Sequence, residues 1–180
     1  MVCGNMYERL VVPGRFQPPH EGHVETVRFA LKHAREVIVV IGSAQDSHSI
    51  RNPLTAGERM ALLDKLFKMR FGEDYCRRIK IVPVMDINMN KVWVQYLRLL
   101  LPRFDGVVSG NPLVRMLFED MGLAVLAQPL KNREECCGTV IREKVLRGDE
   151  SWRSCVPKEI LDDLLEMGFV ERLRRLVEEG

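Results

Sequence analysis

Long apolar runs, paired cysteine motifs and runs of like charge are all absent from this chain of 180 residues. No apolar run reaches membrane-spanning length, and residues 1–9 lack the basic start and apolar stretch of a signal peptide, so we expect a cytoplasmic protein with no membrane partner. The net charge is +2 and the Lys and Arg residues are dispersed, so nucleic acid is not an expected partner either.

The cysteines form no C-x-x-C pair, and no His follows them at zinc-finger spacing. We therefore expect no structural metal site, and free thiols in a reducing cytosol. The five cysteines are Cys3, Cys76, Cys136, Cys137 and Cys155.

Three common functional signatures are also missing. The chain has no G-x-x-x-x-G-K-[ST] phosphate loop, no G-x-G-x-x-G dinucleotide fingerprint and no G-x-S-x-G nucleophile elbow. These absences are compatible with a transfer reaction that needs no covalent enzyme nucleophile.

What the sequence does contain is an alternation of short β-rich runs and longer helical patterns. The predicted strands are residues 10–12, 37–41, 79–84, 106–108 and 123–127. Residues 37–41 are apolar throughout, which is typical of a strand buried on both faces of a parallel sheet. We predict an α/β fold: a Rossmann-like, doubly wound, parallel five-stranded sheet with helices on both faces.

Helical signals fill the segments between these strands. Thr55 and Glu58 form a T-x-x-E capping box that opens a helix, and Asn111 with Pro112 predicts the start of another. Further helices are expected at residues 24–34, 91–101, 139–147, 157–167 and 170–177. We expect a single domain over residues 1–180, with its core at about 8–150 and a short helical C-terminal portion at about 151–180.

The unusual polar residues cluster directly after the predicted strands. The clusters are residues 14–23, 42–53, 86–90, 109–111 and 137–142. Because the carboxyl ends of parallel strands meet at one edge of the sheet, where ligands bind in open α/β sheets, this pattern predicts a nucleotide cleft.

Residues 14–23, G-R-F-Q-P-P-H-E-G-H, form the most informative cluster. His20 and His23 lie three residues apart at the expected start of a helix, so both rings can face one side. Gly14 permits close approach of a ligand, Gly22 removes a side chain that could crowd a phosphate, and the helix N-terminus attracts an anion. The segment predicts a phosphate site; a metal-binding pair and an ordinary structural pair of histidines are the alternatives.

The H-x-G-H pattern preceded by G-R-F-Q-P resembles the H-x-G-H nucleotidyltransferase superfamily and, in this form, the archaeal-type nicotinamide-mononucleotide (NMN) adenylyltransferases. Three further segments extend the resemblance in the same order: I-G-S-A-Q-D-S-H-S-I-R-N-P-L-T-A-G-E-R at 41–59, S-G-N-P-L-V at 109–114 and C-G-T-V-I-R at 137–142. Together they cover about residues 10–157.

The resemblance implies an enzyme that makes NAD⁺ and pyrophosphate from ATP and NMN, by direct in-line displacement at the ATP α-phosphate. It assigns the phosphate contacts to Arg15, His20, His23, Arg51 and Arg142. Other ATP-binding residues would be Gly14, Phe16, Gly22, Gly110, Asn111, Cys137 and Thr139. NMN-binding residues would be Ser43, Asp86, Asn88 and Trp93.

Other properties follow from the same resemblance. Mg²⁺ or another divalent cation would be held mainly by the ATP phosphates and water, and the chain would form a homo-oligomer such as a hexamer. Thr139 would cap the helix that bears Arg142. The family usually has Ser where this chain has Cys137, whose thiol is a weaker hydrogen-bond donor.

Most of these residues also have ordinary structural interpretations. A single Arg is typical of a solvated surface, Trp93 fits the apolar face of an amphipathic helix, and Asp86 and Asn88 are common turn residues. Two alternative functions also remain. One is a related nucleotidyltransferase with another phosphate acceptor such as FMN, although those relatives more often begin G-T-F-D or G-G-F-D. The other is a nucleotide-sensing protein without turnover.

Overall fold

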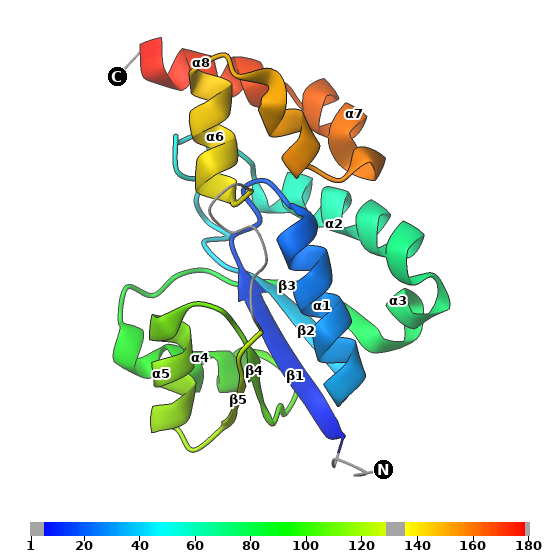
Figure 1. The fold of residues 1–180 in the computed structure, drawn as a ribbon. Helices are drawn as coiled ribbons and strands as arrows, with labels where there is room; N and C mark the ends of the chain where they lie inside the picture. Colours follow the sequence, from blue (N-terminus) through cyan, green and yellow to red (C-terminus); the bar gives the residue numbers. More distant parts are fainter. Residues whose placement is uncertain (1–5, 129–135, 179–180) are drawn as a thin grey trace.

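A computed structural model describes residues 6–128 and 136–178 of the chain. Its centre is a five-stranded parallel sheet in the order β3-β2-β1-β4-β5 (Figure 1). The strands are β1 (Tyr7–Gly14), β2 (Ala34–Ile41), β3 (Ile79–Pro83), β4 (Gly106–Val108) and β5 (Ala124–Leu126). The predicted doubly wound fold is confirmed. The strand order reverses between β1 and β4, which makes that gap the topological switch point.

Two apolar layers cover the sheet because neighbouring residues of a strand point to opposite faces. In β1, Leu10 and Val12 belong to one buried cluster and Val11 to the other. Figure 1 shows α1 and α2 on one side of the sheet and α4 and α5 on the other. The helices of these layers are α1 (Glu21–His33), α2 (Ala56–Phe71), α3 (Glu73–Arg78), the short 3₁₀ turn η1 (Asn90–Val92), α4 (Trp93–Leu100) and α5 (Pro112–Asp120).

One glycine permits the close pairing of β4 with β5. A side chain at Gly106 would lie 2.2 Å from the carbonyl oxygen of Ala124, which is closer than any real contact. Gly106 and Ala124 are register partners in the two strands, so any larger residue at Gly106 would push β5 away.

The C-terminal helices lie beyond the carboxyl edge of the sheet, beside α2 (Figure 1). They are α6 (Gly138–Leu146), the 3₁₀ segment η2 (Glu150–Cys155), α7 (Lys158–Glu166) and α8 (Phe169–Glu178). Trp152, Ile160 and Phe169 are buried and continue the cluster that covers the α1 side of the sheet. Within the described ranges, no helix is long and apolar enough to cross a membrane.

Two expectations from the sequence were wrong, one about the cysteines and one about the cap of α6. Cys136 and Cys155 form a disulfide, whereas we expected free thiols; the fold brings η2 against the start of α6 and so joins two residues 19 apart in sequence. Cys76 and Cys137 are free as expected, and Cys3 lies outside the described residues. Thr139 is not the N-cap of α6, because that helix starts one residue earlier and Cys137 occupies the cap position.

Candidate active site

Loops after β1 and β4 enclose a pocket of about 270 Å³ at the topological switch point, closed on the third side by the start of α6. Almost every residue predicted for ATP lines it. They are Gly14, Arg15, Phe16, His20, Gly22, His23, Gly110, Asn111, Cys137, Thr139 and Arg142. Arg51 is the exception. Gln17 and Ser109, which we had not predicted, also line the pocket.

The buried side chain of Phe16 forms part of the wall of this pocket. It adopts a left-handed backbone conformation with φ of 55°, and its ring is 1% exposed. The ring packs on His23 with centroids 4.4 Å apart, and a side chain on Gly14 would approach it to 3.0 Å. Gly14 is therefore required by this ring, and the Phe16 ring helps to fix the position of the His23 ring.

His20 and His23 are stacked at the N-terminus of α1, with ring centroids 3.7 Å apart. The backbone N–H of His20 donates to Nδ1 of His23 at 3.1 Å, so the neutral His23 ring carries its proton on Nε2. Burial lowers the pKa of His20 to about 4 and, with the neighbouring His20, lowers that of His23 well below its ordinary value. Both rings are thus neutral near pH 7, and His23 keeps an Nε2–H donor for an anion.

Gly22 makes room for the neighbouring histidine, a role that the sequence did not indicate. A side chain there would lie 3.0 Å from Nδ1 of His20, so the glycine first makes room for the histidine ring. That Nδ1 atom is buried and has no hydrogen-bond partner in the described chain. A buried polar atom without a partner is costly, so it marks a place for a ligand or water.

Arg15 and Arg142 bring positive charge to the pocket without a carboxylate partner: within the described ranges, neither forms an ion pair. Burial, together with repulsion from Arg51, lowers the pKa of Arg15, and its buried Nη1 atom has no hydrogen-bond partner among the described residues. Burial followed by repulsion from Arg15 lowers the pKa of Arg142 to about 10. Its Nη1 donates to the carbonyl of Gln17 at 2.7 Å, and its Nη2 to Oγ1 of Thr139 at 3.3 Å.

Arg51 belongs to the same electrostatic group although it does not line the pocket. It is exposed in the loop between β2 and α2, and its charge acts on both Arg15 and Arg142. An anion that binds near these three guanidinium groups would relieve the repulsion among them.

The start of α6 adds a second helix N-terminus to the pocket, opposite that of α1. The first N–H groups of a helix have no intrahelical acceptor and attract anions. Cys137 occupies the N-cap without a side-chain capping bond, and a side chain at Gly138 would lie 2.9 Å from the carbonyl oxygen of Gln17. Gly138 therefore allows α6 to approach the loop after β1.

Arg59 is a functional support that sequence reasoning missed. This fully buried side chain donates to four carbonyl oxygens, those of Arg15, Gly42, Ser43 and Thr55. It thereby ties the loop after β1 to the loop after β2. The capping box placed Arg59 in the first turn of α2, but no sequence pattern indicated which carbonyls that turn would face.

A second pocket, of about 210 Å³, lies where β3 leads into α4, and Asp86, Asn88 and Trp93 line it together with residues of α5. Asp86 accepts from the backbone N–H of Ser43 at 3.2 Å and from its hydroxyl at 2.5 Å. Trp93 packs edge-on against Phe118, with centroids 6.2 Å apart. The four residues predicted for NMN are therefore near one another, while Ser43 reaches this pocket through Asp86.

The donors available for a metal ion are few. Among the described residues there is no group of three or more His, Cys, Asp and Glu side chains that could hold one, and the residues around the larger pocket include no carboxylate. This lining fits a cation that arrives already coordinated by phosphates and water.

A parallel sheet with an anion pocket at its switch point, two helix N-termini and stacked neutral histidines defines a nucleotidyltransferase-type site. Residues 11–144 match the family described as cytidylyltransferase-like. The chain belongs to this family, and within it to the group of archaeal nicotinamide-nucleotide adenylyltransferases.

Two curated relatives match over almost their whole length. The chain is 56% identical over 171 residues to the nicotinamide-nucleotide adenylyltransferase of Aeropyrum pernix, covering 95% of this chain and 98% of that one. It is 42% identical over 168 residues to that of Ignicoccus hospitalis, covering 93% and 97%.

A solved structure shares the fold at lower identity. A bifunctional NMN adenylyltransferase/ADP ribose pyrophosphatase from Francisella tularensis, crystallised with AMP and a Mn ion, matches with a TM-score of 0.73 and 20% identity. The match covers 94% of this chain and 52% of that one, so this chain spans about half the length of the bifunctional protein.

Proposed function

We propose that this protein is an adenylyltransferase that makes NAD⁺ and pyrophosphate from ATP and NMN. The observation that carries the proposal is the pocket in which the stacked, neutral His20 and His23 lie beside Arg15 and Arg142, two arginines that form no ion pair with any described residue. Such a site should bind a polyanion favourably, because the ligand supplies the negative charge that the arginines lack. The names of the relatives add the acceptor, NMN.

In this proposal, the ATP phosphates bind at the N-termini of α1 and α6. His20, His23, Arg15, Arg142 and, from the loop above, Arg51 contact the phosphate oxygens. The backbone at Gly14, Gly22 and Gly110 lies close to the nucleotide, with Asn111, Cys137 and Thr139 around it. NMN takes the second pocket, with its nicotinamide ring against Trp93 and its polar groups near Asn88 and the Ser43–Asp86 pair.

The chemistry is a single displacement. An oxygen of the NMN phosphate attacks the α-phosphorus of ATP, the bond from that phosphorus to the oxygen bridging to the β-phosphate breaks, and its electron pair leaves with pyrophosphate. No general base is required, because a phosphate monoester is largely dianionic above its second pKa of about 6. The protein brings two polyanions together and stabilises the charge on the transferred group through preorganised donors.

A divalent cation, Mg²⁺ in our proposal, would neutralise part of the charge on the phosphates. The pocket lining supports coordination by the nucleotide and water rather than by protein carboxylates. The cation bound to the Francisella tularensis protein is Mn, so both metals belong in the assay.

Pyrophosphate release from ATP, measured across a panel of acceptors, tests the proposal. We expect turnover with NMN and little or none with FMN, pantetheine phosphate or glycerol phosphate; nicotinic acid mononucleotide completes the panel. Turnover with FMN but not with NMN would assign the protein to another acceptor. Tight binding of ATP or NAD⁺ without pyrophosphate release would make it a nucleotide sensor.

We also propose that the chain works as one domain and as a homo-oligomer such as a hexamer in the cytoplasm. Large apolar side chains on α4 and α5 support an interface there, since Leu99 is 78% exposed and Met116 is 49% exposed. Light scattering coupled to size-exclusion chromatography measures the state, and a monomer at micromolar concentration would contradict it.

A further inference from the structure

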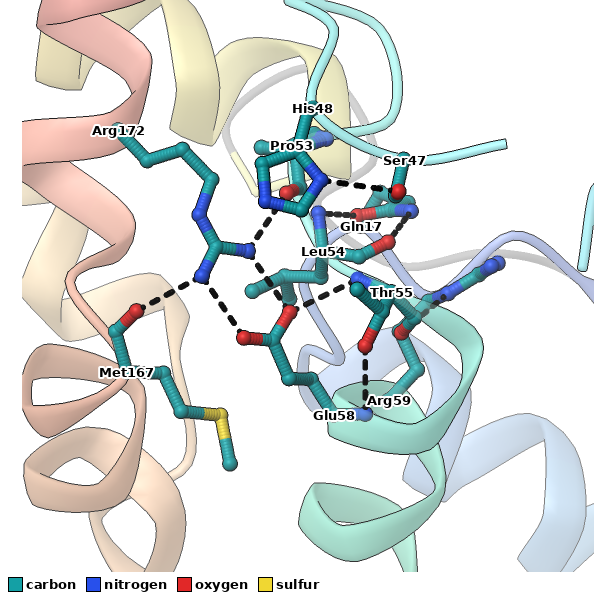
Figure 2. Close-up of polar contacts among 10 residues, drawn as sticks. All are labelled: Gln17, Ser47, His48, Pro53, Leu54, Thr55, Glu58, Arg59, Met167 and Arg172. Atoms are coloured by element: carbon teal, nitrogen blue, oxygen red, sulfur yellow. Dashed lines mark hydrogen bonds and ion pairs between the residues drawn. The ribbon is translucent and has the colours of Figure 1, made fainter. Parts of the chain in front are cut away.

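Arg172 of α8 does not line either nucleotide pocket, but it is bonded firmly to elements that do reach the site. Its Nη1 donates to Oε2 of Glu58 at 2.7 Å and to the carbonyl of Pro53 at 2.8 Å (Figure 2). Its Nη2 donates to Oε1 of Glu58 at 2.8 Å and to the carbonyl of Met167 at 3.0 Å. A bidentate carboxylate pair with two further carbonyl bonds holds a guanidinium in one orientation.

Arg172 contacts the segment that directly follows Arg51 in the chain. Pro53 is two residues further on, and Glu58 closes the start of α2 by accepting from the backbone N–H of Thr55 at 2.8 Å (Figure 2). Thr55 Oγ1 in turn accepts from the N–H of Glu58 at 3.1 Å. Arg172 thus binds both sides of the junction between the loop and α2.

Gln17 holds the same junction from the opposite side. Its amide Nε2 donates to the carbonyl of Leu54 at 2.8 Å, and its Oε1 accepts from the N–H of Leu54 at 2.9 Å (Figure 2). Gln17 is 2% exposed and belongs to the loop that lines the pocket, so its two bonds hold the backbone of Leu54 against that loop. Arg172, by contrast, bonds the carbonyl of the preceding residue, Pro53, to helix α8.

Arg51 depends on this backbone for its position. Among the described residues, its side chain has no hydrogen bond or ion pair, and its charge is repelled by Arg15 and Arg142. The turn that contains it is closed by Ser49 and Asn52, through bonds of 3.3 and 3.0 Å. If the end of this turn were released, repulsion would favour moving Arg51 away from the pocket.

We propose that Arg172 is a positioning residue for ATP binding: through Pro53 and Glu58 it fixes the loop that carries Arg51 toward the pocket. The proposal rests on the role of Arg51 in ATP binding given above. Of the C-terminal helices, those beyond α6 line neither of the two described pockets. The proposal gives one of them, α8, a function in the site.

The test compares Arg172→Ala and Arg172→Lys with Arg78→Ala. Arg78 is a matched control because it also donates to carbonyls, those of Leu31, Ala34 and Arg35, and pairs with Asp74, but at the opposite edge of the sheet. We measure the Kd for ATP by calorimetry, KM for ATP and NMN, kcat and Tm. Arg172→Ala should weaken ATP binding by about 5- to 30-fold, the loss expected for charge-assisted bonds. The KM for NMN should change by less than about two-fold.

Arg172→Lys keeps an ammonium near Glu58 and should recover part of the ATP affinity, and it carries the test if the alanine variant does not fold. Arg78→Ala should lower Tm to a similar extent and leave both KM values unchanged. Adding Arg172→Ala to Arg51→Ala should change ATP affinity by less than about two-fold, because the two residues act through one contact.

Three results would overturn the proposal. Arg172→Ala could leave the KM for ATP unchanged, as Arg78→Ala should, or it could raise the KM values for ATP and NMN equally. In the double variant, the losses of ATP affinity from Arg51→Ala and Arg172→Ala could multiply. An Arg51→Ala variant with unchanged ATP affinity would remove the role of Arg51 and this inference with it. Failure of NMN turnover while ATP binding still responds to Arg172 would instead refute only the acceptor.

Discussion

Two groups of arginines in this molecule meet opposite electrostatic conditions. Arg15 and Arg142 at the pocket have lowered pKa values, because burial and neighbouring arginines disfavour their charge. Arg70 and Arg172, which join α2 to the C-terminal helices, have raised pKa values, because hydrogen bonds to Glu159 and Glu58 favour it. Within the described residues, the first group forms no ion pair and is only partly compensated by more distant carboxylates such as Asp86, whereas the second group is paired within the fold.

This difference indicates a division of labour. A paired arginine holds elements together, as when Arg70 joins Glu159 of α7 to Glu21 of α1 with bonds of 2.7 and 2.6 Å. An unpaired, partly buried arginine costs stability in the free protein and is available to a ligand. Substitution of a pocket arginine should therefore lower activity with little loss of stability. Substitution of a paired arginine should lower stability with little loss of activity.

The largest effect is expected at His23, the donor with a fixed tautomer in the pocket. His23→Ala should lower kcat by about 10²- to 10³-fold, the usual cost of losing one transition-state donor, with the protein still folded. His33→Ala is the control, because His33 lies at the far end of α1 with Nδ1 on the carbonyl of Phe29. It should stay within about two-fold of the native rate. Steady-state kinetics and circular dichroism measure both, and a His23 variant with native turnover would refute the assignment.

Arg15→Met and Arg70→Met test the comparison directly. Arg15→Met should lower kcat/KM for ATP by about 10²-fold and leave the free energy of unfolding unchanged or up to about 1 kcal/mol higher, because it removes a buried atom that has no partner. Arg70→Met should lower the free energy of unfolding by about 1–2 kcal/mol, since it leaves Glu159 unpaired, and change turnover by less than about three-fold.

Urea unfolding and initial rates provide both quantities for each variant. Equal losses of stability in the two variants would show that the arginines of the pocket are compensated after all. The division between the two regions would then be wrong.

Acid should affect the pocket before it affects the paired region. The pKa of His20 falls from 6.5 in the unfolded chain to about 4 in the fold, so between these values the unfolded state binds more protons and stability decreases as pH falls. That change corresponds to about 3 kcal/mol. Glu58 and Glu159 have pKa values lowered by hydrogen bonds to Arg172 and Arg70, so their contribution is present above 4.5 and lost below it.

Urea unfolding between pH 7 and pH 4 measures this dependence. His20→Asn should flatten the upper part of the curve, whereas Glu159→Gln should change only its acid end. If stability is constant from pH 7 to pH 5 in the native chain, the histidines are not held neutral as we describe.

The positions of strands and helices were predictable because they follow from local pattern. Residues 37–41 are apolar without interruption and form the C-terminal five residues of β2, and the capping box at Thr55 and Glu58 opens α2 as predicted. Helix α3, with sequence E-D-Y-C-R-R, was missed because six mostly charged residues with no buried member carry no apolar periodicity.

The predicted pocket residues came together because parallel strands bring their carboxyl ends to one edge. The supports of that pocket could not be predicted in the same way. Arg59, Gln17 and the Cys136–Cys155 disulfide depend on distances between segments that are far apart in the chain, and such distances have no local signature. Arg59 and Gln17 even lie within the segments that indicated the family, but only the fold shows which backbone atoms they reach.

The smallest expected effect concerns Cys137, where the pocket and the supporting structure meet. Its sulfur makes no capping bond although it occupies the N-cap of α6, and serine is a preferred residue there. Cys137→Ser should raise the free energy of unfolding by about 0.5–1 kcal/mol and leave turnover within about two-fold. Thermal unfolding with NMN kinetics measures both. A gain in stability at the expense of ATP affinity would mean that the serine hydroxyl competes with the phosphates for the N–H groups of α6, and that this helix end serves the ligand rather than the fold.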